Sequence, residues 1–231
     1  MKTVAITQPD LFAYLPYYQV INMVDEFIVY DDVQFITRGW INRNNLLING
    51  EAKRFTVSLS GASSNKMINE IDVLDDFTNL RKTLTVSYAK APYINETLRV
   101  FDAVCSFKDK NLAKFIDHSF ECIGDYIGIS TPRRFSSDIE KDNSLRAQDK
   151  IIDIAKRIDA TRYINSIGGV ELYDNQKFID NGLELKFLKT KPVTYKQFKD
   201  TFVPNLSIID VMMFNDAATI KEMLQQYELV S

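Results

Sequence analysis

Two adjacent carboxylates, Asp31 and Asp32, directly follow a short apolar segment at residues 26–30. Neighbouring carboxylates repel each other, so they need a hydrogen-bond donor, a cation or a metal ion close by. The pair can act as a general base, hold a magnesium ion, or form a turn that one aspartate caps. We favour a functional role, because Arg38 and Arg43 follow in a loop that can return over the same place.

The loop at residues 37–44 contains the only tryptophan of the chain together with two arginines and two asparagines. Arginine presents a planar fork suited to phosphate or carboxylate groups, and the tryptophan ring offers a flat face for a base or a sugar. A loop of this composition is usually just solvated. Beside the acidic pair it is more typical of a binding loop, and its candidate ligand-binding residues are Arg38, Trp40, Asn42, Arg43 and Asn44.

Polar residues also follow the other expected strands. Open parallel sheets bind ligands in the crevice beyond the carboxyl ends of their strands. Strand ends always carry some polar residues, but their concentration after the first two strands favours a ligand site there. Gly168 could let the backbone approach a phosphate, but without a phosphate-loop motif it is equally typical of a flexible turn. The candidates are Gln8 after residues 3–7, Gln34 after the acidic pair, Ser136 and Ser137 after residues 129–135, and Ser166 and Gly168 after residues 162–166.

The order of apolar and polar segments predicts an α/β fold. A strand at residues 3–7, a helix and a strand at 26–30 form a unit that implies a parallel pair. We expect one domain over residues 1–231, an open, mostly parallel sheet with helices on both faces and a helical insertion at about 77–127 after the third strand. Residues 34–49 are expected to be irregular. The predicted strands are residues 3–7, 26–30, 54–60, 129–135, 162–166 and 183–188, and the predicted helices are 17–25, two within 77–104 that meet at Ala91-Pro92, 109–127, 144–159, 174–181 and 216–228.

Length and composition are those of an ordinary globular domain. The 231 residues are 45% hydrophobic and 26% charged, and the formal net charge is −3 with a pI near 5.3. This balance argues against bulk binding of nucleic acid, which needs a strongly basic face, but not against a local basic cleft for a phosphorylated ligand. The N-terminus is unlike a signal peptide and no stretch is long enough to cross a bilayer, so we expect a cytoplasmic protein without membrane insertion.

The chain has too few histidines and cysteines for a zinc site or a set of disulfides. The chain has a single histidine, His118, and two cysteines, Cys105 and Cys122, without paired metal-binding spacing. A zinc site needs about four ligands, so we expect no structural zinc. His118 falls beside the apolar face of a predicted helix and is interpreted as a helix-flank residue rather than a catalytic base. The cysteines are expected to be reduced rather than joined in a disulfide.

Blocks of sequence along nearly the whole chain resemble the WbqC-like family. No single block is specific, but the combination is. One departure is Tyr17, where the family pattern is expected to have tryptophan after the proline. The blocks, in order, are Gln8-Pro9, residues 15–18 (LPYY), 27–35 (FIVYDDVQF), 38–44 (RGWINRN), 88–93, Ser136-Ser137, 163–169 and 202–210.

The resemblance implies a role in making bacterial surface polysaccharides such as O-antigens. It implies modification of a nucleotide-linked amino sugar, for example by transfer of an acyl or aminoacyl (glycyl) group to the sugar amine. In that reaction Asp32 would be the general base or orient the amine, and Asp31 would position the amine or hold a metal. The other roles would fall to Arg38 and Arg43 for the diphosphate, Asn42 and Asn44 for sugar hydroxyls, and Gln8 facing the same crevice.

A non-catalytic protein that binds a sugar nucleotide, or an accessory subunit of a biosynthetic complex, is the alternative. An exposed apolar patch at residues 206–214 would support it, although a buried helix is the preferred interpretation of that segment. No covalent nucleophile is evident, which favours direct attack by the substrate amine. The residues identify no cofactor, and they leave the donor, the sugar and the number of subunits open.

Overall fold

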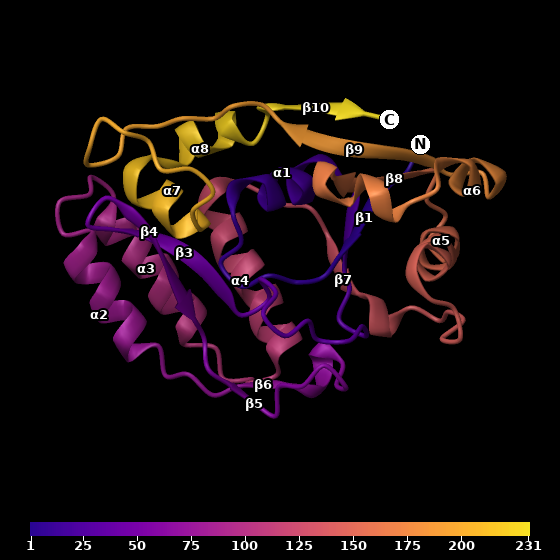
Figure 1. The fold of residues 1–231 in the computed structure, drawn as a ribbon, viewed down its shortest axis with the longest axis horizontal. Helices are drawn as coiled ribbons and strands as arrows, with labels where there is room; N and C mark the ends of the chain where they lie inside the picture. Colours follow the sequence, from indigo (N-terminus) through magenta and orange to yellow (C-terminus); the bar gives the residue numbers. More distant parts are fainter.

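The computed structural model describes residues 1–231 and is built around a six-stranded sheet in the order β10-β9-β8-β1-β2-β7 (Figure 1). Neighbouring strands pair in parallel, except that β10 runs antiparallel to β9. The mostly parallel α/β sheet that the sequence predicts is therefore confirmed. The strands are β1 (Thr3–Thr7), β2 (Glu26–Val29), β7 (Arg133–Phe135), β8 (Arg162–Ser166), β9 (Glu184–Thr190) and β10 (Tyr227–Val230).

The first βαβ unit forms as predicted. Helix α1 (Leu15–Met23) begins with Pro16 in its first turn, where a missing N–H costs no hydrogen bond. The chain then returns through β2, which pairs in parallel with β1 from Val4 opposite Glu26 to Thr7 opposite Val29. Both strands end at the same edge, so the residues that follow Thr7 and Val29 lie side by side.

Helices cover both faces of the sheet. Alternate residues of a strand point to opposite faces, and in β1 Ala5 packs into one apolar cluster while Val4 and Ile6 pack into the other. Helices α5 (Ala147–Arg157) and α6 (Asn175–Asp180) supply the second cluster, with Ile154 and Phe178 fully buried. The first cluster lies beneath α1, α4 (Leu112–Ile127), α7 (Ile208–Phe214) and α8 (Ala217–Met223) (Figure 1).

The connection between β2 and β7 contains a hairpin outside the main sheet. Strands β3 (Arg43–Ile48) and β4 (Glu51–Thr56) pair antiparallel around Asn49 and Gly50, which have φ angles of +57° and +82°. An Asn-Gly pair with positive φ is the turn that two-residue hairpins favour. The expectation of an irregular segment at 34–49 is therefore wrong for residues 43–48. The predicted strand at 54–60 is strand at 54–56 and 59–60, but these residues lie outside the main sheet.

The remainder of that connection is short strands and helices. Helices α2 (Thr78–Ser87) and α3 (Ile94–Cys105) flank Pro92, and α4 ends at Gly128 in the left-handed conformation, both as predicted. Phe120 of α4 packs on Phe27 of β2, so α4 belongs to the layer on the sheet and the predicted insertion through residue 127 is not confirmed. The short elements are β5 (Leu59–Ser60), η1 (Ile68–Glu70) and β6 (Asp72–Val73).

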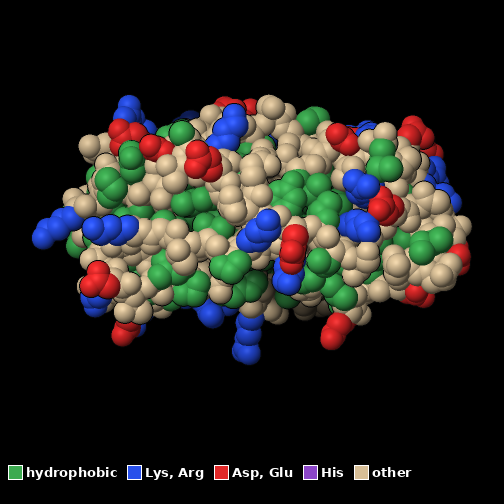
Figure 2. All heavy atoms as spheres, turned by 90° about the horizontal axis from the view of Figure 1, so that it is seen from above, with side chains coloured by type: hydrophobic (Ala, Val, Ile, Leu, Met, Phe, Trp, Pro, Cys, Tyr) green, Lys and Arg blue, Asp and Glu red, His purple; other side chains and the backbone are tan.

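The C-terminal segment differs from its prediction. Helix α8 ends at Met223, and residues 227–230 form β10 against β9 instead of continuing the helix predicted to residue 228. Helix α7 is buried along its length up to Met213, as preferred from the sequence, so residues 206–214 offer no exposed apolar patch. No helix of the structure combines the length and the apolar character that spanning a bilayer requires. Figure 2 shows one face on which cationic and anionic side chains are interspersed, without a continuous basic patch.

Candidate functional site

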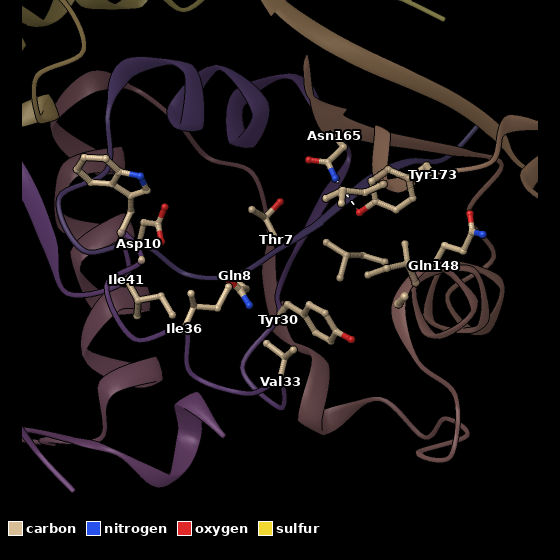
Figure 3. A pocket seen from close by; sticks show the side chains of 16 residues that line it. Thr7, Gln8, Asp10, Tyr30, Val33, Ile36, Ile41, Gln148, Asn165 and Tyr173 are labelled. Carbon is tan, nitrogen blue, oxygen red and sulfur yellow. Dashed lines mark hydrogen bonds between the residues drawn. The ribbon is translucent and has the colours of Figure 1, made fainter. Parts of the chain in front are cut away.

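A cavity of about 660 Å³ lies at the carboxyl edge of the parallel strands, and we call it the crevice cavity. Thr7 and Gln8 enter it from the end of β1, Tyr30 from the end of β2 and Asn165 from β8. In Figure 3 these side chains lie between Asp10 on one side and Tyr173 on the other. The remaining wall is largely apolar and is formed by Ile6, Val33, Ile36, Gly39, Trp40, Ile41, Ala147, Gln148, Ile151 and Leu172.

Asp10 is a carboxylate at this cavity that the sequence reasoning missed. It lies two residues beyond Gln8, and no hydrogen bond or ion pair within the protein engages its side chain. Burial raises the pKa of Asp10 from 3.8 to about 7, because nothing nearby stabilises the charged form. The signal was available: Asp10 follows the first strand by three residues, and Asp31 follows the second by two.

Residues from distant parts of the chain fix the segment that carries Asp10. The backbone N–H of Leu11 donates to the Ile41 carbonyl at 2.9 Å, which holds the Trp40 loop beside Asp10. The carbonyl of Phe12 accepts from Asn44 Nδ2 at 2.9 Å and from Ser207 Oγ at 2.7 Å. Hydrogen bonds of the neighbouring residues Leu11 and Phe12 therefore fix the backbone beside Asp10 against the 41–44 segment and the start of α7.

A second cavity of about 480 Å³, the asparagine cavity, adjoins the first. The two cavities share Asp10 and Trp40, so Asp10 borders both. Asn44 uses its amide to hold Phe12 and Asn45, which leaves it little capacity for a ligand. The side chains of Asn45 and Asn205 make no hydrogen bond within the protein. The full lining is Asp10, Tyr14, Trp40, Asn44, Asn45 and Asn205.

Asp31 and Asp32 lie beyond β2 as predicted, but other side chains occupy their oxygens. Asp31 is 3% exposed and accepts hydrogen bonds from the backbone and hydroxyl of Ser137, from Ser136 and from Asn69 at 2.7–3.0 Å. These four hydrogen-bond donors engage both oxygens of the Asp31 carboxylate. The serine pair that was expected to bind substrate therefore joins the end of β7 to the end of β2.

Asp32 pairs with two lysines rather than with an arginine. Lys141 Nζ is 2.7 Å and Lys150 Nζ is 3.3 Å from Asp32 Oδ2. The single hydroxyl hydrogen of Ser136 is shared between Asp31 and Asp32. Burial raises the pKa of Asp32, but the hydrogen bonds from Lys141 and Ser136 and the charges of both lysines outweigh it and leave the pKa below its usual value. Asp32 borders a smaller cavity of about 270 Å³ with Gln34 and Lys150. This cavity shares Tyr30, Val33 and Ala147 with the crevice cavity, but Asp10 does not border it. A catalytic role for either carboxylate stays a prediction.

The structure places the residues of the predicted binding loop in different environments, and only some of them reach the cavities. Trp40 is 48% exposed and reaches both cavities, with the Arg54 guanidinium 5.4 Å from its ring centroid. Arg38 is exposed with φ of +66°, and Arg43 lies at the start of β3 with an unpartnered, buried Nε. Neither arginine borders the crevice or asparagine cavity. Asn42 is buried and donates to the Val57 carbonyl at 2.8 Å, which stabilises the hairpin.

At the end of β8, the structure brings Asn165 rather than its neighbours into the crevice cavity. Asn165 Nδ2 donates to the Tyr173 hydroxyl at 2.8 Å, and burial raises the pKa of Tyr173, so that this phenol stays protonated. Ser166 and Gly168 do not border the cavity. Gly168 is exposed in the helical turn η3 (Ile167–Leu172), and a Cβ atom there would meet nothing within 4 Å.

His118 and the two cysteines lie away from these cavities. His118 is on the flank of α4, stacked on Phe107 at 4.4 Å and close to Glu121, as its sequence position indicates. Both cysteines are free thiols, and burial raises the pKa of each. No group of three or more His, Cys, Asp or Glu side chains is placed to hold a metal ion.

A parallel sheet with a partly polar crevice at its carboxyl edge defines a class of α/β protein that has space for small ligands at that edge. The chain belongs to the WbqC-like protein family, whose model matches residues 8–222. The matched range includes the whole lining of the asparagine cavity and all of the crevice lining except Ile6 and Thr7. It is similar to the uncharacterized protein Rv1507c of Mycobacterium tuberculosis (strain ATCC 25618 / H37Rv), with 26% identity over 230 residues that cover 97% of this chain and 98% of the relative. No solved structure matches the chain significantly.

Proposed function

We propose that the protein is a transferase that places an acyl or aminoacyl group on the amine of a nucleotide-linked amino sugar used for bacterial surface polysaccharide. The observation that carries this proposal is Asp10, an unpaired carboxylate with a pKa of about 7 on the border of two cavities. A general base works best when its pKa lies near the working pH. The polysaccharide setting follows from the family resemblance.

The chemistry needs one proton acceptor at the reacting amine. The neutral amine attacks the carbonyl carbon of an activated acyl ester or thioester, a carbon–nitrogen bond forms, and the bond to the leaving oxygen or sulfur breaks. Asp10 takes the proton that the nitrogen loses and returns it to the leaving oxygen or sulfur, which departs as the alcohol or thiol. In this proposal Asp31 and Asp32 have a structural role and connect β2, β7 and α5, because their oxygens already have partners.

Two adjoining cavities suit two substrates that react directly. The asparagine cavity offers amide groups and the Trp40 ring to a hydroxylated sugar, and the largely apolar crevice cavity offers room for the donor. Gln8 and Asn165 supply polar contacts in the latter. No serine, cysteine, lysine or histidine borders either cavity, which favours direct transfer over a covalent intermediate.

The test is amide formation by purified protein from UDP-glucosamine and a panel of acyl thioesters and aminoacyl esters, followed by mass spectrometry. Asp10→Asn should lower the rate by roughly 10²–10⁴, because it removes the base without changing the size of the side chain. The exposed Asp138→Asn is the matched control and should react at the wild-type rate.

The pH dependence supplies a second readout. The wild-type rate should fall about tenfold for each pH unit below 7, since only ionised Asp10 accepts a proton. An Asp10→Asn protein with undiminished turnover, or a rate that does not decline below pH 7, would refute Asp10 as the base.

A further inference from the structure

A third cavity, of about 380 Å³, continues from the asparagine cavity on the side away from the crevice cavity. The two share Tyr14 and Asn205, whereas the third cavity and the crevice cavity share no residue. We call it the Lys191 cavity. Asp10 and Trp40 join the first two cavities, and Tyr14 and Asn205 join the last two, so the three lie in series.

The Lys191 cavity combines a cation with flat apolar faces. Lys191 is exposed and has no carboxylate within ion-pair distance. Tyr195 and Phe202 lie edge to face with centroids 5.0 Å apart, next to Pro192 and Pro204. A free ammonium attracts phosphate, and aromatic and proline faces pack against planar rings.

A hydrogen-bond network around the Tyr195 hydroxyl fixes the position of the Tyr195 ring. Its hydroxyl donates to Asp210 Oδ1 at 2.6 Å, and Asp210 also accepts from Tyr88 at 2.7 Å and from Gln197 at 3.1 Å. Burial raises the pKa of Asp210, although these three hydrogen bonds oppose the change. Because Asp210 is fully buried, the network fixes the ring without presenting a charge to the cavity.

From this series we infer that one ligand with two chemically different parts occupies the asparagine and Lys191 cavities together. A hydroxylated pyranose ring fits the free amides of Asn45 and Asn205 and the Trp40 face, and a nucleoside diphosphate fits Lys191, Tyr195 and Phe202. The inference rests on the proposed function, in which this ligand is the acceptor. It places the diphosphate at Lys191 rather than at Arg38 and Arg43.

Binding can be measured without turnover, which separates this inference from the transferase proposal. We would titrate the full chain with UDP-N-acetylglucosamine, UDP and N-acetylglucosamine by calorimetry. Lys191→Gln should weaken UDP-N-acetylglucosamine and UDP about tenfold, the equivalent of roughly 1.4 kcal/mol, and leave N-acetylglucosamine unchanged. Asn205→Ala should weaken the two sugar-containing probes by several-fold and UDP much less.

Two matched controls test whether the diphosphate binds at Lys191 or elsewhere. Lys196→Gln removes an exposed lysine of the same segment that does not border the cavity, and Arg43→Ala removes the arginine expected from the sequence to bind the diphosphate. Both should bind all probes as wild type does. Equal binding by Lys191→Gln and wild type, loss of binding in Arg43→Ala, or a wild type that binds neither UDP probe would overturn the inference. Binding in the expected pattern without any amide product would count against the transferase proposal alone.

Discussion

Asp10 and Asp210 are two aspartates whose pKa is raised by burial, and they differ in their partners. Asp210 accepts hydrogen bonds from Tyr88, Tyr195 and Gln197, so its oxygens are used inside the protein. Asp10 has no such donor and faces two cavities. A carboxylate that is costly to bury and has no structural partner is more typical of a functional group than of a core residue.

The partly buried charge of Asp10 should destabilise the protein at alkaline pH. Its folded pKa of about 7 exceeds the unfolded value of 3.8, so the stabilising effect of proton uptake is present below 3.8 and is lost as pH rises through 7. Asp10→Asn should therefore raise the melting temperature at pH 8 by at least about 2 °C and change it little at pH 4, as measured by thermal unfolding. A variant less stable than wild type at pH 8 would contradict the absence of partners for Asp10.

At the scale of elements, Asp31 and Asp32 hold three of them together. Ser136 and Ser137 follow β7, and Lys150 belongs to α5, yet all three contact the two carboxylates that follow β2. The β2–β7 pairing is short, from Phe27 opposite Arg133 to Val29 opposite Phe135. Hydrogen bonds between these side chains therefore continue the connection between β2 and β7 beyond the last backbone hydrogen bonds of the pair. This connection lies on the Tyr30 side of the crevice cavity.

Asp32→Asn should destabilise the fold because it leaves two buried lysines without their partner. The side chains of Lys141 and Lys150 are 2% and 9% exposed, and breaking a buried pair costs about 3–5 kcal/mol. The depressed pKa of Asp32 means that its contribution is present above 3.8 and lost as pH falls through the lower folded value.

Urea unfolding at pH 7, with Asp138→Asn as the exposed control, measures the effect of Asp32→Asn. A fully stable Asp32→Asn protein that has lost its activity would instead favour the catalytic role that the sequence suggests.

At the scale of the molecule, the sheet links both apolar clusters. Val4 and Ile6 belong to one cluster and Ala5 to the other, so neither face can open without disturbing β1. The hairpin and α3 also contribute Leu46 and Phe101 to the larger cluster, which extends well beyond the sheet. This continuity supports the expectation that residues 1–231 form one domain.

Calorimetric unfolding should therefore show a single transition. The enthalpy at the midpoint should be about 160 kcal/mol, from roughly 0.7 kcal/mol for each residue, with the van't Hoff and calorimetric values in agreement. Two resolved transitions would instead divide the hairpin and helices α2 and α3 from the sheet.

Short-range signals in the sequence determined much of the architecture. The apolar runs of β1 and β2, Pro16 at the start of α1 and Gly128 after α4 are local features, and the elements they predict are present. The placement of a polar crevice beyond the strands also follows from a parallel sheet. Asn49-Gly50 was an equally local signal for the hairpin and was overlooked. Strand β10 had no comparable local signal, because an edge strand depends on its partner β9.

Only the tertiary structure decided which carboxylate is free. Asp31 and Asp32 stand out in the sequence, but their partners Ser136 and Lys150 lie more than a hundred residues further along the chain. The pKa of Asp10 depends on burial by residues that the sequence does not place next to it, and on the lack of any donor there. Hydrogen-bond donors and solvent access are set by packing between distant segments, whereas strand and helix periodicity is set by neighbours in the chain.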